Sequence, residues 1–156
     1  KKAEKEELIA DVEEMLKLMG LDKHRKMNPY DLSGGQQQKL AIAKVLMLKP
    51  EILLLDEPTK GLDPYFKESL AGIFKKLNEM GVTIIMVSHD AEFCAQHAKR
   101  CAMLFDGRIV SEGNVREFFG GNSFYTTAAS RISRNIFRNC VTCGQVIEAV
   151  RNRRLE

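Results

Sequence analysis

Three short groups of polar and small residues have the chemistry needed to bind and cleave a phosphate compound. In chain order they are Ser33-Gly34-Gly35-Gln36, Asp56-Glu57 and His89. The acid pair ends an aliphatic run, residues 52–55, and the histidine follows a second apolar run, residues 82–87. Their order and spacing together predict a chain that handles the phosphates of a nucleotide.

The first group has the features of a helix start that faces an anion. Ser33 and Gln36 fit a capping box, and a helix N-terminus carries unpaired N–H groups and a partial positive charge. Gly34 and Gly35 would let a phosphate come close to that backbone, because neither has a Cβ. The alternative is an ordinary capped helix after a glycine turn, and these residues alone fit both interpretations.

The acid pair would lie at the carboxyl end of a parallel sheet, where ligands bind in such folds. Neighbouring strand residues point to opposite sides, so Asp56 and Glu57 can have different tasks. One can hold Mg²⁺, usually through water. The other can orient or deprotonate an attacking water, which typically contributes about 10²–10⁴ in rate. The alternative is a strand end with two solvated acids.

Two further residues belong to the same predicted edge. His89 could hydrogen-bond to a terminal phosphate there, or be a polar residue satisfied by its surroundings. Asp63 lies in the loop just past the acid pair, where it could also be a turn aspartate.

Hydrophobic periodicity predicts alternating helices and strands. We expect helices over residues 6–19, 33–48, 66–80, 91–100, 114–119 and 145–151. The runs 52–55 and 82–87 are typical of strands buried on both faces of a parallel sheet. Residues 101–105 and 108–111 flank Asp106-Gly107, a pair typical of a hairpin turn. This alternation indicates an α/β architecture, while residues 120–139 give no clear pattern.

Composition is that of an ordinary soluble globular protein. The 156 residues are 44% hydrophobic and 29% charged, with a net charge of +3. That charge does not argue for a nucleic-acid partner, and no apolar stretch reaches the roughly 18 residues that a membrane span needs. From Arg131 onward, six Arg stand against two Glu. This basic end is either solvated or meets an acidic partner or membrane lipids.

Four cysteines occur, at positions 94, 101, 140 and 143. Cys140 and Cys143 have the spacing of half a zinc site, but no second pair of ligands accompanies them. Structural or incidental cysteines in a reducing compartment are the simpler interpretation.

Taken together, these residues resemble the ATP-binding cassette (ABC) ATPases. Leu32-Ser33-Gly34-Gly35-Gln36 is similar to the signature motif, and residues 52–57 to the Walker B strand with its catalytic glutamate. Gly61-Leu62-Asp63 resembles the loop that communicates across the dimer, and His89 the switch histidine. Lys39, Lys44 and Lys60 depart mildly from the family pattern. The resemblance covers residues 1–113.

The resemblance implies a role for each site residue. Asp56 would help hold Mg²⁺, Glu57 would polarise the attacking water, and His89 would contact the γ-phosphate of ATP. The implied cofactor-binding residues are Ser33, Gly34, Gly35, Gln36 and Asp63. Those of the signature motif would bind ATP held by the opposite subunit, so that two ATP molecules lie in a head-to-tail dimer.

A narrower resemblance is to the energy-coupling factor importer ATPases, carried by residues 58–63, 105–110 and 122–131. It implies an ATP-binding subunit on the cytoplasmic face of the cell membrane that drives solute uptake. Its partners would be a second ABC ATPase subunit and transmembrane transporter subunits, with no nucleic acid. The alternative is a soluble ABC ATPase acting in repair or translation.

No Gly-x-x-x-x-Gly-Lys-Ser/Thr phosphate loop occurs in the sequence. In the family this Walker A loop precedes the signature, so the resemblance implies a partial P-loop NTPase core without its Walker A half. Residues 1–50 would be part of the helical subdomain, 51–120 the C-terminal part of the core, and 121–156 a partly helical tail. We expect no ATPase activity from this chain alone. We also expect unpaired strand edges, with a rearranged sheet, an oligomer or poor folding as the result.

Overall fold

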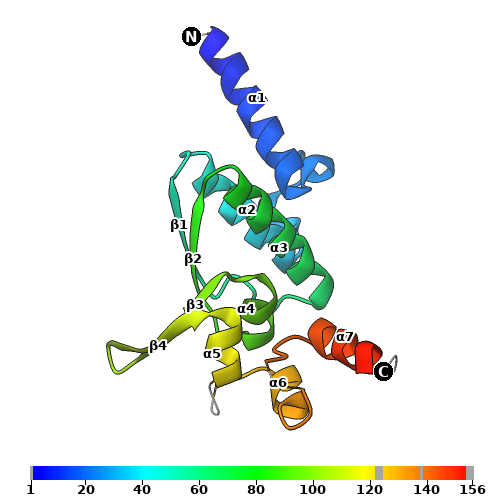
Figure 1. Cartoon of the computed structure of the whole chain (residues 1–156). Helices are drawn as coiled ribbons and strands as arrows, with labels where there is room; N and C mark the ends of the chain where they lie inside the picture. Colours follow the sequence, from blue (N-terminus) through cyan, green and yellow to red (C-terminus); the bar gives the residue numbers. More distant parts are fainter. Residues whose placement is uncertain (1, 122–124, 138, 154–156) are drawn as a thin grey trace. The chain divides into compact units, whose positions relative to one another are not determined.

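The computed structural model describes residues 2–121, 125–137 and 139–153. The chain divides into two compact units, Lys1–Val87 and Ser88–Glu156. Both units combine helices with strands (Figure 1), so the expected α/β class is confirmed. Residues 122–124, Arg138 and Arg154, which belong to the importer-like segment and the basic end, lie outside the described residues.

The first unit contains the predicted helices and strands, with boundaries that shift by a few residues. They are α1 (Lys2–Met19), two 3₁₀ helices (Asp22–His24 and Pro29–Asp31), α2 (Gly34–Leu46), β1 (Ile52–Asp56), α3 (Pro64–Glu79) and β2 (Thr83–Val87). Helix α1 ends at Gly20, whose φ of 66° is easily reached without a Cβ. The N–H groups of Gly20 and Leu21 donate to Lys17 O (3.1 Å) and Leu16 O (2.8 Å), the two bonds of a Schellman motif.

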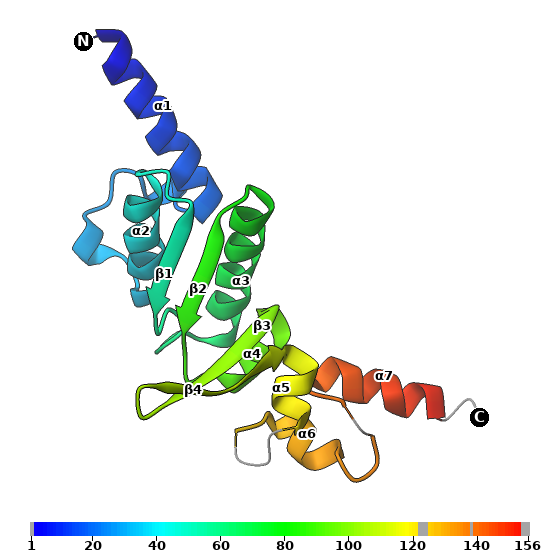
Figure 2. The ribbon, with the colours of Figure 1, turned by 60° about the vertical axis from the view of Figure 1, so that its left-hand side comes forward.

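Strands β1 and β2 form a two-stranded parallel sheet, as predicted. The register runs from Ile52 opposite Thr83 to Asp56 opposite Val87. Helices α2 and α3 lie on the same side of this sheet (Figures 1 and 2). The core beneath them is aliphatic and aromatic, and its most buried members include Ile42, Leu46, Leu53, Leu70, Ile73 and Leu77.

The prediction that both strands are buried on both faces is wrong. Leu53 is 2% exposed, but its neighbour Leu54 is 72% exposed, and Ile85 and Val87 on β2 are also exposed. The cause is that the two helices cover one face only, so the strand alternation leaves every second side chain on the other face.

The second unit contains α4 (Ala91–His97), β3 (Arg100–Phe105), β4 (Arg108–Asn114), α5 (Val115–Gly121), α6 (Ala128–Ser133) and α7 (Cys143–Arg153). Strands β3 and β4 form the predicted antiparallel hairpin, with Asp106 and Gly107 at φ values of 48° and 71° in its turn. Helix α4 is shorter than predicted because Ala98 is already extended. Helix α6 lies in the region that the sequence left without a clear pattern.

Each described strand has one hydrogen-bonded neighbour, since β1 pairs only with β2 and β3 only with β4. This agrees with the expectation of unpaired strand edges. The expected oligomer and the expected poor folding stay predictions.

The second unit has its own core around the aromatic residues of α5. Ala95, Phe118, Phe119 and Val141 form its buried centre. The Phe119 ring lies edge-on to Phe118 at 5.0 Å and stacks on Tyr125 at 6.3 Å between ring centroids. The core therefore joins α4 and α5 to residues that follow α5 in the chain.

All four cysteines are free thiols. Cys94 and Cys101 pack against the core of the second unit, and burial raises the pKa of the Cys101 thiol. Within the described ranges no helix is long and apolar enough to cross a bilayer.

Candidate functional site

The first turn of α2 is closed by the predicted capping box. Oγ of Ser33 accepts from the Gln36 N–H (3.4 Å), and Oε1 of Gln36 accepts from the Ser33 N–H (2.9 Å). This turn contains no acidic residue, so no carboxylate within it neutralises the partial positive charge of the helix end. Because the Ser33 hydroxyl already serves the cap, an anion here would depend mainly on backbone N–H groups.

The side chain of Gln36 is held at both ends. With Oε1 turned to Ser33, the amide nitrogen faces His24, and the two Nε2 atoms are 3.0 Å apart. For this contact to be a hydrogen bond, the amide donates and the imidazole Nε2 accepts, which places the ring proton of His24 on Nδ1. The start of α2 is thereby tied to the first 3₁₀ helix, Asp22–His24.

The two glycines of this turn have different surroundings. A Cβ added at Gly34 would have no neighbour within 4 Å, so the backbone there is open to an approaching ligand. A Cβ added at Gly35 would lie 2.4–2.8 Å from three ring atoms of Phe66. The glycine at position 35 is therefore required by packing against α3, whereas the sequence interpretation assigned both glycines to phosphate access.

Lys39, one turn further along α2, completes this contact between helices. Its Nζ donates to Ser69 Oγ (2.7 Å) and lies 5.2 Å from the centre of the Phe66 ring. The residue is buried, and this burial lowers the pKa of its ammonium group. Phe66 therefore contacts α2 at two points, Gly35 and Lys39.

The acid pair lies at the carboxyl end of the parallel sheet. Asp56 is the last residue of β1 and is exposed, whereas Glu57 is partly buried. The Glu57 N–H donates to Val87 O (2.9 Å), which places Glu57 beside the end of β2. Its φ of 45° is in the left-handed region, an uncommon conformation for a residue other than glycine.

Asp63 is the N-cap of α3. Its Oδ1 accepts from the Phe66 N–H (3.0 Å), and Pro64 occupies the first helical position. The carboxylate is exposed and fixes the first turn of α3, so the turn-aspartate alternative describes its local role. A nucleotide contact for Asp63 stays a prediction.

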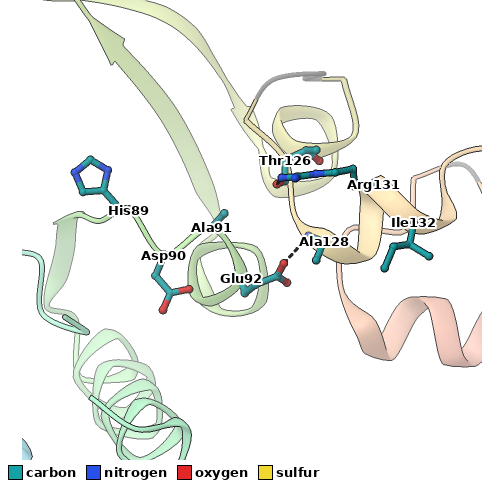
Figure 3. Close-up of a pocket in the computed structure, with 8 residues that line it drawn as sticks. All are labelled: His89, Asp90, Ala91, Glu92, Thr126, Ala128, Arg131 and Ile132. Carbon is teal, nitrogen blue, oxygen red and sulfur yellow. Dashed lines mark hydrogen bonds between the residues drawn. The ribbon is translucent and has the colours of Figure 1, made fainter. Parts of the chain in front are cut away.

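His89 belongs to the second unit, where it is exposed and precedes α4 by two residues. It lines an open pocket of about 500 Å³ (Figure 3). The other lining residues are Asp90, Ala91, Glu92, Thr126, Ala128, Arg131 and Ile132. Asp56 and Glu57 belong to the first unit, so the predicted meeting of these acids with His89 stays a prediction.

The residues of the first unit are compatible with a nucleotide that brings its own metal ion. The open backbone at Gly34 suits an anion, and Asp56 offers one exposed carboxylate. Mg²⁺ is usually held by one or two carboxylates together with phosphates and water. Among the residues that the structure describes, no group of three or more His, Cys, Asp or Glu side chains could hold a metal by itself.

Sequence reasoning missed the contacts of Phe66 and Lys39 between α2 and α3, and of Glu92 in the pocket that His89 lines. The contacts of Phe66 and Lys39 join two helices, and the helical pattern of α3 does not show which ring would meet Gly35. Glu92 accepts a hydrogen bond from Ala128, 36 positions away in the chain. No local pattern would have indicated that pair.

Known proteins resemble this chain in sequence. The family model described as "ABC transporter" matches residues 1–60. A protein of Bacillus anthracis named "Putative ABC transporter ATP-binding protein" is 46% identical over 140 residues, or 90% of this chain and 25% of that protein. The energy-coupling factor transporter ATP-binding protein EcfA of Methanocaldococcus jannaschii is 37% identical over 130 residues, or 83% of this chain and 47% of that protein.

A solved structure resembles the chain in fold as well. That structure is cbiO1 from Clostridium perfringens, described as part of the ABC transporter complex cbiONQ, with a TM-score of 0.68 and 32% identity. The match covers 72% of this chain and 45% of that one. The chain thus spans a quarter to about half of the relatives it matches. It belongs to the ATP-binding cassette family, and its fold is that of part of an ABC ATPase domain.

Proposed function

We propose that this chain is part of the ATP-binding subunit of an ABC-type membrane importer, which couples ATP hydrolysis to solute uptake. The observation that carries the proposal is the first turn of α2, where the cap is satisfied, no acid is present and the backbone at Gly34 is open. These are the properties that an anion needs at a helix N-terminus. In the proposal this turn contacts the γ-phosphate of ATP bound by a second ABC ATPase subunit.

Within this proposal, the residues of the first turn divide the work. The Gly34 backbone receives the phosphate, and Ser33 and Gln36 keep the turn closed through the capping box. Because Gly35 has no Cβ, the turn packs closely against Phe66, and the neighbouring Gly34 lies on the open side. Asp63 keeps α3, which carries Phe66, at a fixed starting point.

Asp56, Glu57 and His89 act on the chain's own nucleotide in the intact subunit. Asp56 would help hold Mg²⁺, usually through water, and the ion would supply positive charge that neutralises the phosphates. Glu57 orients the attacking water, and His89 hydrogen-bonds to the γ-phosphate. The left-handed backbone at Glu57 supports such a role, since strained residues cluster at functional sites.

We also propose the partners and the location that the importer hypothesis implies. Energy-coupling factor ATP-binding proteins are among the similar sequences, and cbiO1 is described as part of a transporter complex. By analogy, this subunit would bind transmembrane transporter subunits from the cytoplasmic face of the membrane and pair with a second ABC ATPase subunit.

The chain as given should not hydrolyse ATP alone, because its sequence contains no phosphate loop to hold the nucleotide in cis. Isothermal titration with Mg²⁺ and ATP should detect no micromolar binding. Micromolar binding to the isolated chain would contradict this part of the proposal.

The contact in trans can be tested by ATP-dependent association. The chain is mixed with an intact importer-type ABC ATPase subunit that has a phosphate loop and a blocked catalytic glutamate, and complexes are measured by sedimentation. Gly34→Asp should abolish the ATP-dependent complex, because it adds a negative charge where the phosphate would lie. It should not unfold the chain, since an acid near a helix N-terminus contributes about 0.3–1 kcal/mol of stability.

Gly72→Asp is the matched control. Gly72 lies on α3, is exposed and has no atom within 4 Å of an added Cβ, so the same chemical change is made away from the proposed contact. This variant should associate like the unmodified chain. Equal loss in both variants, or association that does not depend on ATP, would contradict the proposed role of α2.

A further inference from the structure

The segment before and within α6 is fixed by buried hydroxyl groups. Thr126 Oγ1 donates to Phe119 O (2.5 Å), and Thr127 Oγ1 donates to Val141 O (2.7 Å). Both threonines are almost completely buried. Buried polar groups that are fully paired give a segment one defined position, so residues 125–133 form a fixed part of the second unit.

Glu92 connects this segment to α4. Its Oε1 accepts from the Ala128 N–H at 2.6 Å, as the dashed line in Figure 3 shows. Ala128 is the first residue of α6, and Thr127 caps that helix by accepting from the Ser130 N–H (3.1 Å). A hydrogen bond to an ionised carboxylate is about twice as strong as a neutral one. Glu92 is therefore a direct polar link between α4 and α6.

Helix α4 in turn continues directly from the loop that carries His89. Asp90 caps α4, since its Oδ1 accepts from the Phe93 N–H (3.0 Å). The Asp90 N–H donates to Ser88 Oγ (3.1 Å), and the Ala91 N–H donates to His89 O (3.1 Å). The backbone of His89 is thus part of the hydrogen-bonded structure that starts α4.

These contacts form one continuous path within the second unit. It runs from the buried threonines to Ala128, through Glu92 to the first turn of α4, and from there to His89. The C-terminal half of α4 is held by the core of the second unit, in which Ala95 and Phe119 are both buried. Glu92 is the residue in the first turn of α4 that makes the hydrogen bond to α6.

We propose that Glu92 is a positioning residue, which holds the His89 loop in place by tying the first turn of α4 to Ala128. The conformation of that loop then depends on the position of residues 125–133, which we call the docked segment. The importance of this coupling for a phosphate contact by His89 rests on the proposed function, but the coupling itself is a property of the second unit.

The test measures amide hydrogen exchange in the full chain, residue by residue, by NMR and without nucleotide. In Glu92→Ala, the Ala128 amide and the amides of residues 89–93 should exchange about tenfold faster or more, while those of Phe118 and Phe119 stay within about twofold. The ring cross-peak of His89 should move. Glu92→Gln should restore both readouts, because its amide oxygen also accepts a hydrogen bond.

Two further variants separate positioning from general stability. Glu112→Ala removes an exposed carboxylate that meets Arg100 at 3.5 Å in the same unit, and should leave residues 89–93 unchanged. Thr126→Val removes the hydroxyl that donates to Phe119 O, and should accelerate exchange at residues 89–93 although that hydrogen bond is made to α5 and not to α4.

Two results would overturn the proposal. One is faster exchange at Ala128 with residues 89–93 unaffected, which would mean that Glu92 stabilises only the position of residues 125–133. The other is uniform acceleration through the second unit, which would indicate lost stability only. Because no nucleotide is used, failure of the importer hypothesis would leave these exchange results intact, and failure of the coupling would leave the ATP-dependent association intact.

Discussion

Gly35→Ala should destabilise the first unit, although alanine is the better helix former. The new Cβ would lie 2.4, 2.7 and 2.8 Å from Cδ1, Cε1 and Cγ of Phe66, closer than real Cβ contacts come. Overpacking of this kind typically costs about 1–3 kcal/mol. The higher helix propensity of alanine than of glycine offsets at most about 1 kcal/mol of this cost, and less in the first turn. The expected net loss is about 1 kcal/mol, or about 4–8 °C in the unfolding midpoint for a unit of this size.

The assay is urea unfolding of the chain, followed by circular dichroism. Gly72→Ala is the control, because the same change at an open position of α3 should raise the free energy of unfolding by about 0.5–1 kcal/mol. The two Gly→Ala changes should therefore have opposite signs.

A second substitution tests whether Phe66 is the cause. Phe66→Leu alone should destabilise the unit through lost packing, but in the Gly35→Ala background it should remove the overlap. The loss in the double variant should then be smaller than the sum of the single losses, by about 0.5 kcal/mol or more. Additive losses, or a Gly35→Ala chain as stable as Gly72→Ala, would refute the reasoning.

Three other changes test separate parts of the first unit. Burial lowers the pKa of Lys39 in the folded chain. Between that lowered pKa and the ordinary one, the unfolded chain binds more protons than the folded chain, so the free energy of unfolding rises with pH. Urea unfolding between neutral and alkaline pH should show a smaller rise in Lys39→Met than in the unmodified chain. Asp63→Ala removes the N-cap of α3 and should cost about 0.5–2 kcal/mol, with Asp63→Asn recovering most of it in the same assay. Leu54→Thr should change the free energy of unfolding by less than about 0.5 kcal/mol because its side chain is 72% exposed; a loss typical of a core position would contradict the one-sided sheet.

The features that the sequence predicted well are those set by neighbouring residues. The capping box at Ser33, the stop at Gly20 and the turn at Asp106-Gly107 each depend on residues within a few positions. Their backbone conformations follow from local hydrogen bonding and from the absence of a Cβ. These features appear in the structure as expected.

The burial of the strands was not predictable in the same way. An aliphatic run such as residues 52–55 is compatible with cover on both faces or on one, and the cover depends on helices elsewhere in the chain. Here α2 and α3 lie on one face, so Leu53 is buried and Leu54 is not. Helix α6 was missed for another reason, because its six residues are too few to show a hydrophobic period.

Gly34 and Gly35 show why a motif recognised by residue type can hide two physical requirements. At position 34 the folded chain leaves room for a side chain, so a glycine is required there only if a ligand must reach the backbone. Position 35 needs no side chain in any case, because Phe66 occupies the space. Phe66 is also the residue whose N–H is bound by Asp63, so packing at position 35 links the start of α2 to the start of α3. Substitutions at Gly34 therefore test the proposed phosphate contact, and substitutions at Gly35 test the packing of the α2 turn against Phe66.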